Sequence, residues 1–70
     1  MAFNYDKLRG RIKEKCGTQE SFAQALGIGK VSLSQRLNNS LNFTQEEMHK
    51  ACVVLEFGKE DIPIYFFVQN

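Results

Sequence analysis

The chain has 70 residues, a formal net charge of +1 and 43% hydrophobic residues. This length allows one domain, residues 1–70, around a small core and leaves no room for a second functional domain. No apolar run is long enough to span a membrane, and we expect a cytoplasmic protein with no membrane partner.

The basic residues are concentrated in the first half of the chain. Residues 1–39 contain seven Lys or Arg and three Asp or Glu, a balance of +4, whereas the rest of the chain has a balance of −3. The total of +1 is low for a DNA-binding domain and argues weakly against one. The basic half is nevertheless what attraction to phosphates would require.

Groups for catalysis or metal binding are scarce. His49 is the single histidine, and we expect Cys16 and Cys52 to be reduced, buried thiols. There is no glycine-rich phosphate loop, and a helical chain of this size has little room for a closed pocket. We therefore expect no enzyme activity, no metal, no cofactor and no small-molecule substrate.

The first predicted helix covers about residues 5–15, with Asn4 as its N-cap. Its inner row recurs at four-residue steps and consists of Leu8, Ile12 and Cys16. Gly10 costs a helix about 1 kcal/mol relative to alanine. We therefore expect this glycine to allow close packing.

The second predicted helix begins after Thr18, whose side chain can accept a hydrogen bond from a free amide of the first turn. It runs from Gln19 to about Leu26, and its inward stripe consists of Phe22, Ala23 and Leu26. Gly27 ends the helix, because only a residue without a Cβ atom adopts the left-handed conformation at little cost.

A third helix is predicted from Lys30 to Asn38, directly after the turn. Leu33 and Leu37 lie one helical turn apart on its inner side, and Ile28 joins the same apolar cluster from the turn. Two helices joined by a turn of about three to four residues must approach each other closely. Residues 18–38 are therefore predicted to form a helix-turn-helix.

This segment resembles the helix-turn-helix of lambdoid phage repressors and Cro-type proteins. Arg36 departs from the pattern, since the family usually has an inward aliphatic residue there, and the neighbouring Leu37 can take that role. The resemblance implies an all-α fold, a compact bundle of about five short helices like the lambda repressor DNA-binding domain. It rests on Gln19, Ala23, Gly27, Ile28, Leu33, Ser34 and Gln35.

The resemblance implies that the third helix enters the major groove of double-stranded DNA. The side chains that would contact DNA are also typical of an ordinary solvated helix face, and the Asn and Ser side chains among them are also typical of local turns. In the first helix, Lys7, Arg11 and Lys15 share a face that either contacts phosphates or only makes the helix soluble. The implied base contacts are Lys30, Val31, Ser32 and Gln35, and the implied DNA-backbone contacts are Gln19, Ser34, Arg36, Asn38, Asn39 and Ser40.

A loop over residues 38–43 precedes the fourth predicted helix. Thr44 and Glu47 have capping-box spacing, and Phe43 with Met48 can form the hydrophobic staple that often accompanies it. Phe57-Gly58 is expected to close this helix, which runs to about Leu55. Its buried residues are expected to be Met48, Ala51, Cys52 and Leu55.

The C-terminal segment, residues 62–68, is unusually apolar for a chain end. A short helix is predicted from Asp61 or Ile62, with Pro63 in its first turn, where a missing amide is harmless. Part of the segment must complete the core. The surplus either packs there too, pairs as a strand with a partner, or forms a homodimer interface of Tyr65, Phe66, Phe67 and Val68.

Two functions compatible with this fold follow. The first is a sequence-specific DNA-binding transcription regulator, a Cro-like repressor of a phage or prophage in a bacterial host, which occupies a partly palindromic operator as a homodimer. The alternative is a protein-interaction module on the same fold, antirepressor-like or antitoxin-like, which binds a protein partner. Gln19, Lys30 and Gln35 favour DNA, whereas the modest charge and the apolar C-terminus favour the alternative.

Overall fold

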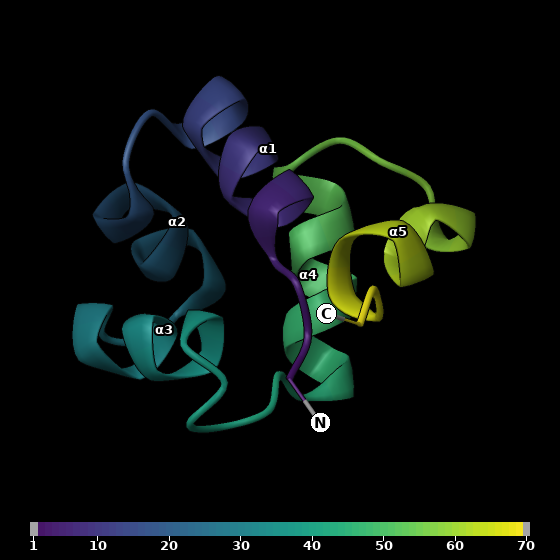
Figure 1. The fold of residues 1–70 in the computed structure, drawn as a ribbon. Coiled ribbons are helices and arrows are strands. Elements are labelled where there is room, and N and C mark those ends of the chain that lie inside the picture. The colour runs from purple at the N-terminus through teal and green to yellow at the C-terminus, as the bar shows by residue number, and fades with distance from the viewer. Residues whose placement is uncertain (1, 70) are drawn as a thin grey trace.

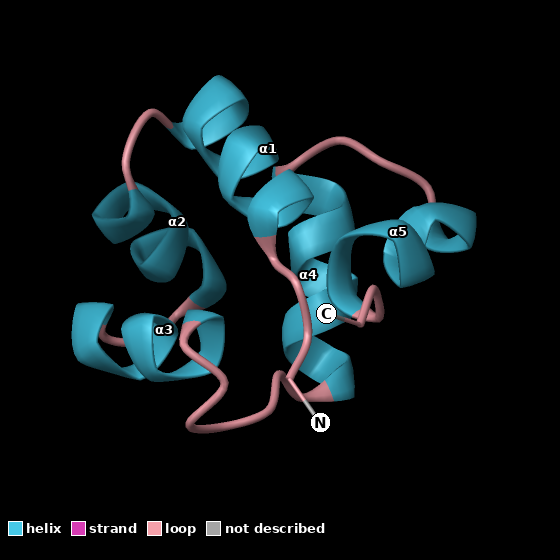
Figure 2. Cartoon of the chain, in the orientation of Figure 1, coloured by secondary structure: helices cyan, strands magenta, loops and turns pink. Residues whose placement is uncertain are grey.

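Helices α1 (Asp6–Cys16), α2 (Gln19–Leu26) and α3 (Lys30–Leu37) make up the first half of the protein in our computed structural model, which describes residues 2–69. The second half contains α4 (Gln45–Val54), a 3-10 helix η1 (Lys59–Asp61) and α5 (Ile62–Phe66). Figure 1 shows α2 and α3 together on one side of α1 and α4, with α5 on the other. The predicted all-α bundle of five helices is confirmed for the described residues (Figure 2).

The helix-turn-helix segment folds as the sequence predicts. The Ser21 amide donates a hydrogen bond of 3.1 Å to the Thr18 hydroxyl, which caps α2. Gly27 ends this helix in the left-handed conformation, with φ 80° and ψ 25°. The Ile28 amide then donates to the Ala23 carbonyl oxygen, which holds the turn against the end of α2. The turn therefore sets how α3 leaves α2.

The other two predicted N-terminal caps, those of α1 and α4, differ in outcome. The prediction of Asn4 as the N-cap of α1 was wrong by one residue, because Tyr5 occupies the N-cap position without a side-chain cap hydrogen bond. Asn4 Oδ1 instead accepts from the Asp6 amide at 2.8 Å. At α4 the capping box is complete, because the Glu47 amide donates to Thr44 Oγ1 and the Thr44 amide donates to Glu47 Oε1. The Thr44 and Glu47 side chains therefore fix where α4 begins.

Two expectations about glycines were wrong. Gly10 is exposed in α1, and a Cβ atom built there meets no atom within 4 Å, so it does not serve close packing. The end of α4 does not depend on Gly58, since Glu56 adopts the left-handed conformation with φ 58°. The Phe57 amide then donates to the Cys52 carbonyl oxygen, and Gly58 instead precedes η1.

All five helices contribute to a single core. Phe43 and Phe66 stack edge to face with ring centroids 5.0 Å apart, and Tyr5 packs on Phe43 from the other side. This aromatic group joins the N-terminal segment, the loop before α4 and helix α5 within the core. The remaining buried apolar residues are Leu8, Ile12, Phe22, Ala23, Leu26, Leu33, Leu37, Ala51, Cys52 and Leu55.

The two ends of the described chain lie against each other. The Asn4 amide donates to the Val68 carbonyl oxygen, and Phe3 forms an isolated antiparallel bridge with Gln69. Asn39, with φ 65°, accepts from the Phe3 amide at 2.8 Å and donates to the Phe3 carbonyl oxygen at 3.0 Å. The C-terminal end thus pairs with the N-terminal segment of its own chain.

Candidate interaction surfaces

The outer face of α3 is the first candidate surface. Leu33 and Leu37 anchor the helix in the core, which turns Lys30, Val31 and Gln35 towards solvent. Val31 is 72% exposed, a high value for an aliphatic side chain. The predicted base contacts Lys30, Val31 and Gln35 therefore do share an exposed region, whereas the fourth, Ser32, is half-buried.

Arg36 faces the protein interior rather than a partner. Its Nε atom donates to Glu47 Oε1 at 2.8 Å, and its Nη1 atom donates to the Ser32 carbonyl oxygen at 2.9 Å. The side chains of the ion pair are only 14% and 11% exposed. Leu37 is buried beside it, so both residues of the departure from the family pattern point inward. The guanidinium that was expected at a phosphate is engaged within the protein.

Three of the other expected phosphate contacts, Ser34, Asn38 and Asn39, also make side-chain hydrogen bonds within the protein. Asn38 Nδ2 donates to the Ser34 hydroxyl at 3.3 Å, and Asn38 Oδ1 accepts from Arg9 at 3.4 Å. Asn39 binds the backbone of Phe3 through both of its side-chain polar atoms. Gln19 and Ser40 remain exposed. Hydrogen bonds within the protein therefore engage both Asn side chains, and of these only the bond between Asn38 and Ser34 is local.

The basic row of α1 serves helix α4. Arg11 donates from Nε to the Leu55 carbonyl oxygen at 2.9 Å and from Nη2 to the Glu56 carbonyl oxygen at 3.0 Å, where α4 ends. Lys15 pairs with the Glu56 carboxylate at 3.7 Å. Free carbonyl oxygens at a helix C-terminus attract cations, so this contact stabilises the end of α4. Lys7 takes part in no ion pair among residues 2–69.

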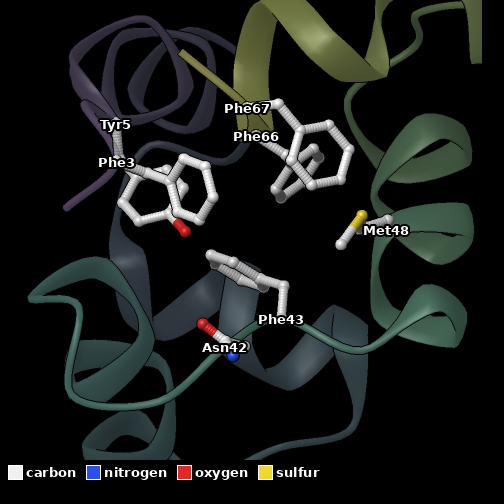
Figure 3. A pocket seen from close by; sticks show the side chains of 7 residues that line it. All are labelled: Phe3, Tyr5, Asn42, Phe43, Met48, Phe66 and Phe67. Atoms are coloured by element: carbon white, nitrogen blue, oxygen red, sulfur yellow. The ribbon is translucent and has the colours of Figure 1, made fainter. Parts of the chain in front are cut away.

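The second candidate surface is an aromatic hollow beside the two chain ends. It has a volume of about 270 Å³. Figure 3 shows rings from the N-terminal segment, the loop before α4 and the end of α5 arranged around it, with the Met48 thioether at one side. The residues that line it are Phe3, Tyr5, Asn42, Phe43, Met48, Phe66 and Phe67. The predicted staple residues Phe43 and Met48 thus border the same hollow.

The expected dimer interface is divided between the core and the surface. Phe66 is 1% exposed, so its ring belongs to the core. Tyr65 is half-buried and stacks on Phe57 with ring centroids 4.4 Å apart. Phe67 and Val68 remain 48% and 40% exposed. Including Phe66 in a self-association surface was therefore wrong, because periodicity does not show which ring of a short aromatic run faces inward.

The environment of the two cysteine thiols affects their ionisation. Burial raises the pKa of the Cys16 thiol. Burial also raises the pKa of the Cys52 thiol, and there its effect is larger than that of the neighbouring charges. Both cysteines are free.

Within residues 2–69, every helix is too short or too polar to cross a membrane.

Comparison with known proteins places the chain in a family. The model of the family described as "Protein of unknown function (DUF739)" matches residues 1–69. The chain belongs to this family. That description assigns no function to the family. No curated protein matches the chain.

A solved structure is similar to this DUF739 member over almost its whole length. It is the solution structure of the modulator of repression (MOR) of the temperate bacteriophage TP901-1 from Lactococcus lactis. The two sequences are 45% identical, the match covers 96% of this chain and 90% of that chain, and the TM-score is 0.82.

This similarity contradicts the first of the two functions expected from the sequence. The similar protein is named a modulator of repression, which fits the protein-interaction alternative better than a Cro-like repressor that occupies an operator as a homodimer. The DNA contacts assigned to Lys30, Val31, Ser32 and Gln35 depended on that hypothesis and stay untested. The error has a physical origin, because a helix-turn-helix sequence specifies a fold and an exposed helix, not the surface that the helix meets.

Proposed function

We propose that this DUF739 protein is a phage regulator that modulates repression by binding a protein partner. The observation that carries this proposal is the 45% identity to the modulator of repression of bacteriophage TP901-1 across 96% of the chain. Identity at this level over nearly the whole length favours a related role as well as a related fold. The lambdoid helix-turn-helix resemblance then describes the architecture on which this role is built.

The charged groups of the chain support a protein partner. Arg9, Arg11 and Arg36 all donate hydrogen bonds to acceptors within the protein. A protein that holds DNA needs several free cations at the phosphates, because counterion release supplies most of its non-specific affinity. The net charge of +1 is in keeping with a surface that meets protein.

The outer face of α3 is the proposed contact surface. Val31 stands at its centre, and the uncharged Gln35 and the single cation Lys30 lie beside it. Protein interfaces combine an apolar centre with a polar rim, and this face has that pattern on a small scale. The lambdoid resemblance implied base contacts on this same face, so the proposal keeps the surface and changes its partner from DNA to protein.

The partner that we propose is the repressor encoded in the same phage genome. A regulator that does not itself occupy the operator must change repression through the protein that does. The proposed complex needs no catalytic group or cofactor in this chain. It predicts that adding the chain changes how much operator the repressor occupies.

A binding experiment tests this function directly. We expect the purified chain to form a complex with that repressor in calorimetry, and to change the repressor's shift of its operator in a gel. The chain alone should give no operator-specific shift. The proposal is wrong if the chain alone binds the operator specifically, with affinity that falls steeply as salt rises, and forms no complex with the repressor.

A further inference from the structure

A second hollow adjoins the aromatic one and extends it into a groove. It has a volume of about 280 Å³ and is lined by Gln45, Met48, His49, Ile62 and Phe67. The aromatic hollow, of about 270 Å³, shares Met48 and Phe67 with it. These two side chains are therefore the wall between two neighbouring sockets. Each socket is large enough for one apolar side chain.

The lining of the groove has the composition of a protein interface. None of the residues that line either hollow is Asp, Glu, Lys or Arg. Aromatic residues and Met predominate, and polar groups are limited to amides, one phenol and one imidazole. Interface centres are enriched in aromatic residues and Met and depleted of charge. An uncharged, aromatic lining has no cation to bind a phosphate, and it can make extensive contacts with apolar side chains.

The rim of the groove leaves apolar surface uncovered. Phe67, part of the shared wall, is 48% exposed. Ile64 and Val68, 43% and 40% exposed, belong to the same segment but line a separate hollow with Asn4, Asp6 and Lys7. Three of the six large apolar side chains that are exposed among residues 2–69 thus lie within one five-residue segment. Such clustering distinguishes an interaction site from the scattered apolar residues that any surface carries.

Two acidic residues adjoin the second hollow in the sequence. Glu60 and Asp61 immediately precede Ile62, which lines the second hollow. Neither carboxylate lies within 4 Å of a Lys, Arg or His nitrogen in the described part of the chain. The other acidic residues of this half, Glu46, Glu47 and Glu56, all have cationic partners. A basic residue of the bound molecule would therefore find free carboxylates here.

We propose that this groove is the docking site for an amphipathic helix of the protein partner. Two apolar side chains one helical turn apart would fill the two sockets, because residues three or four apart in a helix lie about 5–6 Å from each other. A Lys or Arg of the same helix would face Glu60 and Asp61. That the helix belongs to a protein partner rests on the proposed function; that the groove accepts such a helix is tested separately.

The first experiment uses the full chain and a defined probe. The probe is a helical peptide of about 15 residues with Leu at two positions four apart and Lys on the flanking turns, a length at which isolated helices begin to form. We expect saturable shifts of the amide NMR signals of Asn42, Gln45 and His49, and none at Val31 or Val53. A control peptide with both Leu replaced by Asn should give no saturable shift.

Variants assign the binding to the groove. Asn42→Trp places a bulky ring at the exposed edge of the aromatic hollow, and Phe67→Ala removes the shared wall. Each should weaken peptide binding by about tenfold, as truncation or blocking of an interface centre does. Val53→Ala is the matched control, because Val53 is 79% exposed on α4 and lines neither hollow. Glu60→Gln with Asp61→Asn should weaken binding of the Leu peptide, because the double variant removes the carboxylates that the peptide's Lys residues would face.

Three results would overturn the proposal. They are equal binding of the two peptides, equal binding by the Asn42→Trp variant and the parent chain, and shifts at the groove that depend only on the chain's own concentration. The last would assign the groove to a second copy. Failure of the proposed function is distinguishable, because the repressor would then shift no amide signal of the chain while the Leu peptide still bound in the groove.

Discussion

The Arg36 guanidinium and the Glu47 carboxylate form an ion pair of 2.8 Å that joins α3, the second helix of the helix-turn-helix, to the first turn of α4. The same Glu47 oxygen accepts the Thr44 amide at 3.0 Å. One carboxylate therefore both completes the cap of α4 and holds α3 in place. This contact explains why an arginine occupies a position where the lambdoid pattern has an aliphatic residue.

We predict that Glu47→Ala lowers the free energy of unfolding by about 3 kcal/mol, because it removes the carboxylate half of the capping box and leaves a nearly buried guanidinium without its partner. Urea denaturation followed by circular dichroism measures this. Glu46→Ala is the matched control, since the Glu46 side chain is 80% exposed and pairs only with Lys50. Its effect should stay below about 0.5 kcal/mol. Equal effects of the two substitutions would refute the structural role of Glu47.

Gly10→Ala should stabilise the protein by about 0.5–1 kcal/mol, because a methyl group there meets no atom within 4 Å and alanine favours the helix. Gly27→Ala is the contrasting variant. It should destabilise by about 1 kcal/mol or more, because Gly27 has φ 80°. Thermal unfolding of both variants measures the difference. A lower melting temperature for Gly10→Ala would mean that this glycine has a role that the packing does not reveal.

Val31→Ser should weaken binding to the repressor by about tenfold while leaving the unfolding free energy within about 0.5 kcal/mol, since the side chain is exposed and contributes to an interface centre. Val53→Ser serves as the control, because Val53 is similarly exposed, at 79%, on a different helix. Calorimetric titration of the two variants separates the helix-turn-helix face from the rest of the surface. Unchanged affinity of the Val31 variant would remove α3 from the proposed interface.

The thiols should react slowly with Ellman's reagent in the folded protein at pH 8, because burial raises the pKa of both and reduces the reactive thiolate. Cys52, 8% exposed, should be slower than the half-buried Cys16. Single Cys→Ser variants assign the two rates. Rates equal to those in urea would contradict the burial.

The same thiols make stability depend on pH in the alkaline range. Since the folded state favours the neutral thiol, their contribution is complete below the ordinary pKa of about 9 and is lost as the pH rises through the raised pKa values. We expect the unfolding free energy to fall above pH 9, and to fall less in the Cys16→Ser and Cys52→Ser variants. A fall of the same size in these variants would assign the effect to other groups such as Tyr5, whose pKa burial also raises.

The amino-acid sequence by itself determined the local structure of this protein. Thr18, Gly27 and the Thr44–Glu47 pair act within one or two helical turns, so their roles follow from the residue types and spacing alone. The inner residues of α1, α2 and α3 also followed from periodicity, because a helix repeats every 3.6 residues whatever it packs against. The all-α fold was therefore predictable.

Only the tertiary structure decided which polar and aromatic side chains remain available to a partner. Arg11 bonds to the end of α4 at a sequence separation of 44 residues, and Asn39 bonds to Phe3 at a separation of 36. Arg36 bonds to Glu47 at a separation of 11. No local sequence pattern predicts such contacts. Phe66 and Phe67 are neighbours of one residue type, yet one completes the core and the other walls a groove. A side chain's availability depends on what the rest of the chain brings to it, and that is a property of the fold.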